Sequence, residues 1–347
     1  MTTHEKYMNR CIQLAKNGLG TTYPNPLVGS VIVYKGKIIG EGWHKKAGEA
    51  HAEVNAINSV KDKTLLSKAT IYVSLEPCSH YGKTPPCADL IAYHKISKVV
   101  IGTIDSFAKV AGNGIKKLLQ SGINVNIGIL EKECKELNKR FFTFHEKKRP
   151  YIILKWAETE DGFIAPLEKD EKKPVWITNQ YSRQLVHKWR TEEPAILVGT
   201  NTVLEDNPSL EARDYYGKSP LRIILDRNNI IAASFQVKNQ KTETIIITDN
   251  NILTKKGSIV YKNIIFDTIL IENLLKYLHL SNIQSVIIEG GARTLQNFID
   301  KDFWDEARVF SNKNKFLTGI EAPKLKINSH TDVQITNDWL KIFRNYD

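Results

Sequence analysis

The sequence lacks several features that would place it in a special class. It has no run of about 18 apolar residues, which a membrane-spanning helix needs. Its first ten residues, MTTHEKYMNR, contain no apolar stretch typical of a secretory signal. Four cysteines in 347 residues are too few for a disulfide framework, and no repeat or low-complexity segment occurs. We therefore expect a globular cytoplasmic protein without membrane partners.

The composition fits a chain that folds into two domains. Apolar residues make up 41% and charged residues 25% of the 347 positions, so each half can bury a core. The net charge is +11 and the pI is about 9.2, values that also occur in nucleic-acid-binding proteins. Because lysine is spread along the chain, we interpret it as surface charge and expect no nucleic-acid partner. A phosphorylated substrate and cofactor also suit a basic protein.

The first half alternates between strand and helix patterns. A helix is expected over 4–17, and a hairpin over 28–42 turns at the Lys-Gly-Lys of 35–37. This alternation predicts a layered α/β sheet with helices on its faces. The remaining expected elements are helices over 51–58, 87–95, 114–122 and 130–146, and strands over 69–77, 98–105 and 124–129.

A polar, charged segment over 145–150 separates this unit from a second α/β pattern. We place domains at 1–147 and 148–347. The second half has short apolar runs typical of buried strands, with a helix over 179–191 between the first two. These runs cover 151–157, 195–200, 221–226, 244–248 and 285–289.

One cluster of residue types predicts a catalytic zinc site. His51, Cys78 and Cys87 offer three ligands, which leaves the fourth tetrahedral position open for water. Bound zinc lowers the pKa of that water toward neutrality, and Glu53 can shuttle its proton to a leaving amine. The alternatives are a surface helix with two buried thiols, or a structural zinc clip in which His80 is the fourth ligand.

The spacing resembles the zinc nucleobase-deaminase signature H-x-E…P-C-x-x-C. His51 opens an expected helix and Cys87 opens another, and helix N-termini stabilise thiolates. The two cysteines are separated by eight residues, SHYGKTPP, instead of two. Cys11 and Cys134 lie in helix-like patterns, and we interpret both as core residues.

Longer blocks resemble the bacterial bifunctional riboflavin-biosynthesis deaminase/reductase family. In the first half they are PNPLVGSVIV, EGWHKKAGEAHAEVNAI and SLEPCSHYGKTPPCADLI; in the second they are KWAETEDG, LVGTNTVLEDNPSL and IIEGGARTL. The long segment between the cysteines is normal for that family. The resemblance implies a cytidine-deaminase-like αβα domain and a dihydrofolate-reductase-like α/β domain. It also implies Zn²⁺ and NADPH as cofactors.

The resemblance implies two consecutive reactions. The first hydrolyses an exocyclic amine of 2,5-diamino-6-(5-phosphoribosylamino)pyrimidin-4-one, with His51, Cys78 and Cys87 holding zinc and Glu53 moving protons. The second reduces the ribosyl group to ribityl. The pyrimidine or its phosphoribosyl tail is expected to contact Asn25, His44, His80, Lys83 and Asp105. Phe107 stands where the family often has asparagine, so the tail is held differently here.

The second half supports a nicotinamide cofactor without a Rossmann fingerprint. Gly290 and Gly291 follow a strand and precede a helix, whose N-terminus can bind a phosphate. The resemblance places NADPH against Ala157, Trp176, Thr202, Asp206, Gly290 and Gly291. It places the phosphoribosyl substrate against Lys155, Arg190, Leu210, Arg213 and Glu289. Lys155 and Glu289 are expected to polarise the sugar C1 and supply a proton, and the two arginines to clamp phosphate.

Two departures and three alternatives accompany this assignment. The family's Ser-Leu-Asp-Gly reads Thr-Glu-Asp-Gly at 159–162, and Pro174 replaces a frequent serine. The alternatives are a nucleic-acid or nucleoside deaminase, a deaminase with a non-catalytic second domain, and a structural zinc protein. We expect a homo-oligomer, although no interface is identifiable from the sequence.

Overall fold

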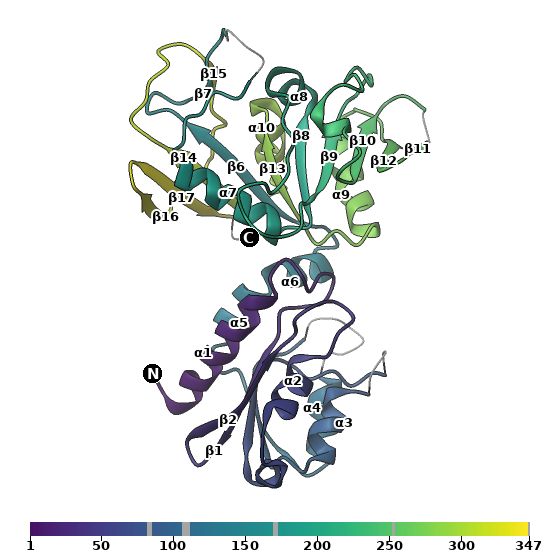
Figure 1. Cartoon of the computed structure of the whole chain (residues 1–347), viewed down its shortest axis with the longest axis vertical. Coiled ribbons are helices and arrows are strands. Elements are labelled where there is room, and N and C mark those ends of the chain that lie inside the picture. The colour runs from purple at the N-terminus through teal and green to yellow at the C-terminus, as the bar shows by residue number, and fades with distance from the viewer. Residues whose placement is uncertain (82–84, 106–111, 169–172, 252–253, 346–347) are drawn as a thin grey trace. The chain divides into compact units, whose positions relative to one another are not determined.

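A computed structural model describes residues 1–81, 85–105, 112–168, 173–251 and 254–345. The chain forms two compact units, Met1–Lys148 and Arg149–Asp347, each with its own sheet and core (Figure 1). In the described part of the chain, no helix has both the length and the apolar character needed to cross a bilayer.

Helices and strands alternate along the first unit. Its helices are α1 (Thr3–Ala15), α2 (Ala52–Ser59), α3 (Cys87–Tyr93), α4 (Asn113–Gln120), α5 (Glu131–Leu137) and α6 (Lys139–Glu146), with 3₁₀ turns at Lys16–Gly18 and Lys63–Lys68. Its strands are β1 (Gly29–Tyr34), β2 (Lys37–Trp43), β3 (Thr70–Leu75), β4 (Lys98–Thr103) and β5 (Asn124–Ile127).

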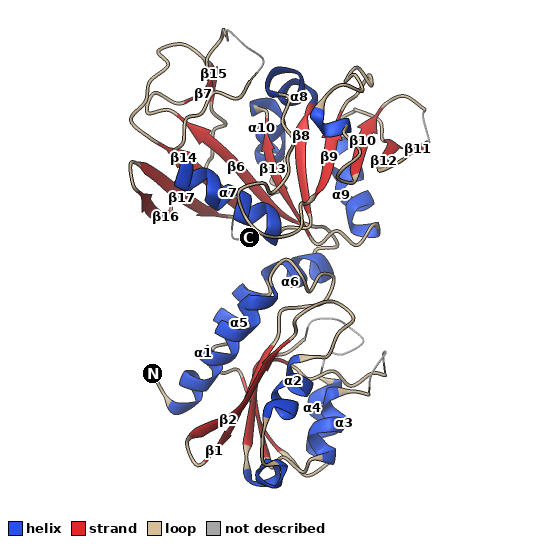
Figure 2. Ribbon diagram, viewed as in Figure 1, coloured by secondary structure: helices blue, strands red, loops and turns tan. Residues whose placement is uncertain are grey.

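The first sheet has the order β2-β1-β3-β4-β5, and helices cover both of its faces (Figure 2). β1 runs antiparallel to β2 and β3, whereas β3, β4 and β5 are parallel. Because neighbouring strand residues point to opposite faces, Val31 packs with α1 and α5 while Ile32 packs with α2, α3 and α4. The layered αβα arrangement predicted from the sequence is confirmed.

The single helix expected over 130–146 is wrong, because the chain breaks at Asn138 between α5 and α6. The Asn138 side chain is buried and binds the backbone of Leu27 twice: its Oδ1 accepts from the Leu27 N–H, and its Nδ2 donates to the Leu27 carbonyl, both at 2.8 Å. This pairing holds Asn138 at φ −105° and ψ 20°, away from helical geometry. The Asn138 side chain thereby fixes the backbone at Leu27, two residues before β1 begins.

The second unit contains a larger sheet. Its helices are α7 (Gln180–Glu192), α8 (Thr200–Asp206), α9 (Leu270–Leu280) and α10 (Ala292–Asp300), with a 3₁₀ turn at Gln236–Lys238. Its strands are β6 (Tyr151–Glu158), β7 (Phe163–Ala165), β8 (Ala195–Gly199), β9 (Leu221–Leu225), β10 (Thr244–Thr248), β11 (Lys255–Lys256), β12 (Ile259–Asn263), β13 (Ser285–Gly290), β14 (Glu306–Ser311), β15 (Ile320–Glu321), β16 (His330–Ile335) and β17 (Asp338–Arg344).

The order of the large sheet is β11-β12-β10-β9-β8-β13-β6-β14-β17-β16. From β12 to β14 the neighbouring strands are parallel, and β11, β17 and β16 pair antiparallel at the two ends. Helices α9 and α10 pack on one face and α7 on the other. Since β8, β13 and β6 are adjacent and parallel, their carboxyl ends lie at one edge, where α/β sheets bind ligands.

Candidate active sites and family membership

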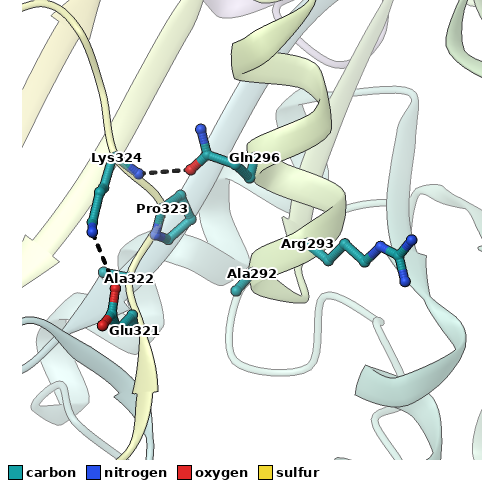
Figure 3. A pocket seen from close by; sticks show the side chains of 7 residues that line it. All are labelled: Ala292, Arg293, Gln296, Glu321, Ala322, Pro323 and Lys324. Carbon is teal, nitrogen blue, oxygen red and sulfur yellow. Dashed lines mark hydrogen bonds and ion pairs between the residues drawn. The ribbon is translucent and has the colours of Figure 1, made fainter.

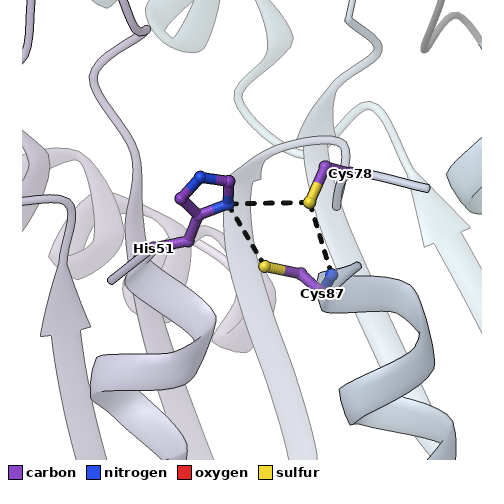
Figure 4. A group of neighbouring side chains, drawn as sticks. All are labelled: His51, Cys78 and Cys87. Carbon is purple, nitrogen blue, oxygen red and sulfur yellow. Dashed lines mark hydrogen bonds between the residues drawn. The ribbon is translucent and has the colours of Figure 1, made fainter. Parts of the chain in front are cut away.

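Three predicted zinc ligands converge in the first unit (Figure 4). Nδ1 of His51 lies 3.6 Å from Sγ of Cys78 and 3.4 Å from Sγ of Cys87. Zinc bonds of about 2.1 Å to nitrogen and 2.3 Å to sulfur at a tetrahedral angle separate the two ligand atoms by about 3.6 Å. The two nitrogen–sulfur distances therefore fit a shared Zn²⁺, and Nδ1 is the histidine atom on the side of the two thiols.

The site offers three protein ligands among the described residues, which is the catalytic pattern with one open position. His80, the fourth ligand of a structural clip, has an exposed side chain and is not part of the cluster. The geometry therefore favours the catalytic interpretation over the structural one.

The fold places both cysteines where thiolates are stabilised. Cys87 is the first residue of α3, and its N–H donates to Sγ of Cys78 at 3.3 Å. Hydrogen bonding from Cys87, followed by that from His51, lowers the pKa of Cys78 well below the ordinary value of a thiol, against the effect of burial. A thiolate is the form that binds a metal ion.

Glu53 lies beside the ligands in the first turn of α2, which His51 caps. Its side chain is buried, and burial together with the charge of Cys78 raises the pKa of Glu53 to about 7. The helical spacing brings Glu53 to the cluster without making it a member of the ligand set. This is the placement that the sequence predicts for a proton shuttle.

Asn25 and His44 meet next to the ligands. Nδ1 of His44 lies 3.1 Å from the carbonyl of Ala50, which makes Nε2 the acceptor for Nδ2 of Asn25 at 3.0 Å. The His44 ring also packs edge-on against the ring of His51, with centroids 5.4 Å apart. The arrangement fixes the Asn25 amide so that its oxygen can accept a hydrogen bond from a ring N–H or amine.

The other residues predicted to bind the pyrimidine or its phosphoribosyl tail differ in their surroundings. His80 is exposed, and Asp105 is buried with its N–H held by Glu76. Lys83 and Phe107 lie outside the described residues.

Glu76 is a structural residue of this site to which the sequence assigned no role. Its buried carboxylate accepts four backbone N–H groups, from Asp105, Gly112, Gly114 and Ile115, at 2.9–3.3 Å. It thereby fixes the start of α4 against the chain that leads to Cys78. A Cβ on Gly114 would lie 2.0 Å from the carbonyl oxygen of Pro77, so the two backbones touch directly.

In the second unit, Lys155, Glu289 and Arg190 form a buried charge cluster. Arg190 donates from Nε and Nη2 to both oxygens of Glu289, at 3.1 and 2.7 Å. Nζ of Lys155 lies 3.9 Å from the same carboxylate. Burial acts to raise the pKa of Glu289, but the charges of Arg190 and Lys155 outweigh it and hold the pKa at about 2.

This pairing changes the expected roles of two residues. Burial lowers the pKa of Lys155, which Glu289 partly opposes. Glu289 is ionised at neutral pH and acts as a hydrogen-bond acceptor, so Lys155 is the better proton donor. The guanidinium of Arg190 is directed at Glu289 and the carbonyl of Glu211, which leaves part of its donor set for a phosphate.

Leu210 and Arg213 lie on the segment that follows α8. Leu210 has φ +57°, and its side chain is buried in the core beside Val203 and Ile224, so its main chain is the part that can contact a substrate. The Arg213 side chain is exposed, and its N–H donates to Nδ1 of His187 at 2.9 Å. His187 is a second residue that the sequence did not single out.

Three of the six residues predicted for NADPH, Thr202, Gly290 and Gly291, meet at the carboxyl ends of β8 and β13. A Cβ on Gly290 would lie 3.1 Å from Oγ1 of Thr202, and one on Gly291 3.3 Å from it. Glycine therefore keeps open the space between Thr202 and the N-terminus of α10, which Gly291 caps. This cradle fits a dinucleotide phosphate.

The other three predicted NADPH residues occupy different positions. Ala157 lies in β6 and Asp206 ends α8. Trp176 is 56% exposed, and its ring carries the guanidinium of Arg183 at 4.7 Å.

The Thr-Glu-Asp-Gly turn at 159–162 is held by hydrogen bonds of its own. Thr159 donates to Asp161 at 2.5 Å, and the Asp161 carboxylate accepts the N–H groups of Phe316 and Leu317. Gly162 has φ +82°, which only glycine adopts freely. The departure therefore leaves the turn after β6 closed.

A pocket of about 340 Å³ lies beside the first turns of α10 (Figure 3). Gln296 closes one side by accepting the N–H of Lys324 at 2.8 Å, and Lys324 pairs with Glu321 at 3.1 Å. No residue predicted from the sequence lines it. Its lining residues are Ala292, Arg293, Gln296, Glu321, Ala322, Pro323 and Lys324.

Family models match both units. The cytidine and deoxycytidylate deaminase zinc-binding region matches residues 1–103, which include all three zinc ligands. The RibD C-terminal domain matches residues 150–314, which include the Lys155–Glu289–Arg190 cluster. The matches agree with the cytidine-deaminase-like and reductase folds expected from the sequence.

Known proteins resemble the chain along almost all of its length. The riboflavin biosynthesis protein RibD of Aquifex aeolicus is 41% identical, over 94% of this chain and 91% of its own. A crystal structure of a diaminohydroxyphosphoribosylaminopyrimidine deaminase/5-amino-6-(5-phosphoribosylamino)uracil reductase from Thermotoga maritima has a TM-score of 0.89 at 37% identity, covering 99% of this chain and 98% of that one. Acinetobacter baumannii RibD has a TM-score of 0.86 at 30% identity, covering 99% of both chains. The chain therefore belongs to the RibD family: it is a bifunctional enzyme of riboflavin biosynthesis, a zinc-binding deaminase joined to an NADPH-dependent reductase.

Proposed function

We propose that the deaminase acts on 2,5-diamino-6-(5-phosphoribosylamino)pyrimidin-4-one, and that the reductase then converts the ribosyl group of its product to ribityl. The observation that carries the first step is the convergence of His51, Cys78 and Cys87 with the buried carboxyl of Glu53 beside them. The substrate matches the activities that name the Thermotoga maritima relative.

Each reaction belongs to one domain, residues 1–147 for deamination and 148–347 for reduction. The family matches at 1–103 and 150–314 lie on either side of this boundary, and the compact units divide between Lys148 and Arg149. The two sites share no residue.

In the deaminase site, Asn25 accepts a hydrogen bond from the pyrimidine and sets its orientation, while His44 holds the amide. His51, Cys78 and Cys87 would hold Zn²⁺, which would supply the Lewis acid that activates water. Glu53 takes a proton from the attacking water and delivers it to the departing amine. Glu76 holds the start of α4 in place. His80 and Asp105 are assigned to the ring or its phosphoribosyl tail, and the same assignment for Lys83 stays a prediction from the sequence.

In the reductase site, Thr202 and the N-terminus of α10 would hold NADPH, which would supply the hydride for the sugar C1. Lys155 hydrogen-bonds the sugar oxygen and provides its proton, and the Glu289 carboxylate keeps Lys155 directed at that oxygen. Arg190 and Arg213 bind the substrate phosphate with the donors that the protein leaves available. Leu210 contributes its main chain.

Three further residues are assigned to the cofactor site of the reductase. Ala157, Trp176 and Asp206 flank the NADPH site. The partners are small phosphorylated molecules and a second copy of the chain, in the cytoplasm, where thiols such as Cys78 and Cys87 stay reduced.

An assay that follows ammonia release and NADPH absorbance together tests both steps. Glu53→Gln removes the proton shuttle, so deamination is expected to fall by about 10²–10⁴-fold while bound zinc stays near one equivalent. The same variant, given the deaminated pyrimidine directly, should oxidise NADPH at the wild-type rate.

Glu131→Gln is the matched control, because Glu131 is exposed on α5, on the opposite face of the first sheet from α2. Retained ammonia release in Glu53→Gln would remove Glu53 from its role. Loss of both activities together would contradict two separate sites. No ammonia from the wild-type enzyme would refute the substrate.

A further inference from the structure

Arg222 is a fully buried arginine in β9, within a strand that otherwise looks like an ordinary apolar core strand. Removing a guanidinium from water is costly, and an apolar side chain of similar volume often serves stability equally well. Arg222 is therefore expected to have hydrogen-bond partners that an apolar side chain at this position could not bind.

Every N–H group of Arg222 has an acceptor. Nε donates once, and Nη1 and Nη2 donate twice each, so all five donors are used. The acceptors are Oγ1 of Thr244 at 2.9 Å, the carbonyls of Ser209 at 3.3 Å, Gln236 at 3.1 Å and Thr242 at 2.7 Å, and Oδ1 of Asn239 at 3.1 Å. Apart from Thr244, these acceptors lie outside the strands, near residue 209 and over 236–242, where a 3₁₀ turn covers Gln236–Lys238.

The same arginine reaches the substrate side of the reductase through Glu211. The Glu211 carboxylate lies 3.9 Å from Nη1 of Arg222 and also accepts from Oγ1 of Thr242 at 3.2 Å. The Glu211 carbonyl accepts a hydrogen bond from Nη1 of Arg190 at 3.0 Å, and Nη2 of Arg190 donates to the Glu289 carboxylate. A continuous set of contacts therefore joins β9 to the Lys155–Glu289–Arg190 cluster.

Arg222 also fixes the segment that carries two proposed substrate residues. It holds the Ser209 carbonyl and the Glu211 side chain, the residues on either side of Leu210. Leu210 has φ +57°, a conformation unfavourable for leucine that needs support from its neighbours. Arg213 follows two residues after Glu211.

We infer that Arg222 is a positioning residue of the reductase: it sets the Ser209–Arg213 segment and the orientation of Arg190 so that both arginines meet the substrate phosphate. The inference rests on the proposed assignment of Arg190, Leu210 and Arg213 to the substrate. Arg222 itself is fully buried, and all five of its N–H donors are bound by protein acceptors.

Arg222→Lys in the full-length zinc-loaded enzyme tests the role, because lysine keeps the charge but cannot reach five separated acceptors. We expect the KM for 5-amino-6-(5-phosphoribosylamino)uracil to rise about tenfold, which corresponds to about 1.4 kcal/mol of lost binding. We expect kcat to stay within about threefold and the Kd for NADPH, measured by fluorescence, to stay within about twofold. Arg344→Lys on β17, the same change at an exposed position, should alter none of these values.

The pattern of outcomes separates positioning from bulk stability. An unchanged KM in a variant that still binds NADPH would overturn the inference, as would parallel weakening of NADPH and pyrimidine binding. If Arg222→Lys fails to fold, Glu211→Gln decides the question: a KM increase of about threefold with unchanged NADPH affinity supports the role, and a wild-type KM refutes it.

Arg213→Met distinguishes this inference from the proposed substrate site. If Arg213→Met leaves the pyrimidine KM unchanged, the site assignment itself fails. If Arg213→Met raises the KM and Arg222→Lys does not, only the role of Arg222 fails.

Discussion

Replacing Glu289 with glutamine should destabilise the reductase unit much more than a single surface ion pair would. The side chains of Glu289, Arg190 and Lys155 are only 7%, 12% and 17% exposed, so solvent screens them weakly. The pKa of Glu289 is about 2 in the folded protein against an ordinary value of 4.5. A difference of about 2.5 pKa units corresponds to about 3 kcal/mol, and breaking a buried pair typically costs about 3–5 kcal/mol.

The measurement is the thermal unfolding of the full-length protein. The transition of the reductase unit is the one that NADPH shifts upward, since a ligand stabilises the unit that binds it. For a unit of this size, about 3 kcal/mol lowers the transition by roughly 6–12 °C. The transition of the deaminase unit should stay in place.

Glu160→Gln is the matched control. Glu160 pairs with Lys315 at 3.2 Å, but the two side chains are 53% and 56% exposed, so its loss should cost less than about 1 kcal/mol. If Glu289→Gln shifts the transition no more than Glu160→Gln does, the buried cluster does not stabilise the unit and the argument from its charges is refuted.

Three further changes test other contacts. Acid should weaken the reductase unit because the pKa of Glu289 is depressed: the stabilisation is complete above about pH 4.5 and lost as the pH falls toward 2, so in acid titration the Glu289→Gln variant should converge on the wild type. Asn138→Ala leaves the Leu27 backbone without two buried partners, and urea unfolding should show a loss of about 2–4 kcal/mol in the deaminase unit alone. Glu76→Ala removes the acceptor of four N–H groups; ammonia release should fall at least about tenfold while NADPH oxidation with deaminated substrate is unchanged, and equal loss of both would contradict a local role.

The sequence predicted the elements whose local pattern is strong. The hairpin around residues 35–37 and the strands at 151–157 and 285–289 appear within about two residues of their expected ends. The single helix over 130–146 was wrong because its break depends on Asn138 binding Leu27, 111 residues away. No window of local sequence contains that contact.

The remaining strands of the second unit were not identified for a related reason. β16 is exposed along most of its length, so it lacks the alternation of apolar and polar residues that marks a half-buried strand. Its pairing with β17, and that of β17 with β14, is set by the sheet as a whole. Local propensity carries little of that information.

The residues of the zinc site are easier to predict from the sequence than those of the reductase site. His51, Cys78 and Cys87 are recognisable because few functions need those residue types together. The sequence does not predict the pairing of Arg190 with Glu289, because the two residues lie 99 positions apart and each alone is compatible with a substrate contact. Glu76 binds four backbone N–H groups, and Arg222 binds three backbone carbonyls besides side chains of distant residues. Such partners leave no pattern in a single sequence.

The contact between Gly114 and Pro77 restricts how this enzyme can diverge. Any side chain at position 114 would collide with a carbonyl next to Cys78, so a saturation library selected for deamination should recover glycine alone there. Lys116, two residues further along the helix, is exposed and should accept most replacements. Descendant lineages can therefore remodel the surface of α4 freely, whereas the first turn of that helix is tied to the metal-binding segment for as long as the chemistry is kept.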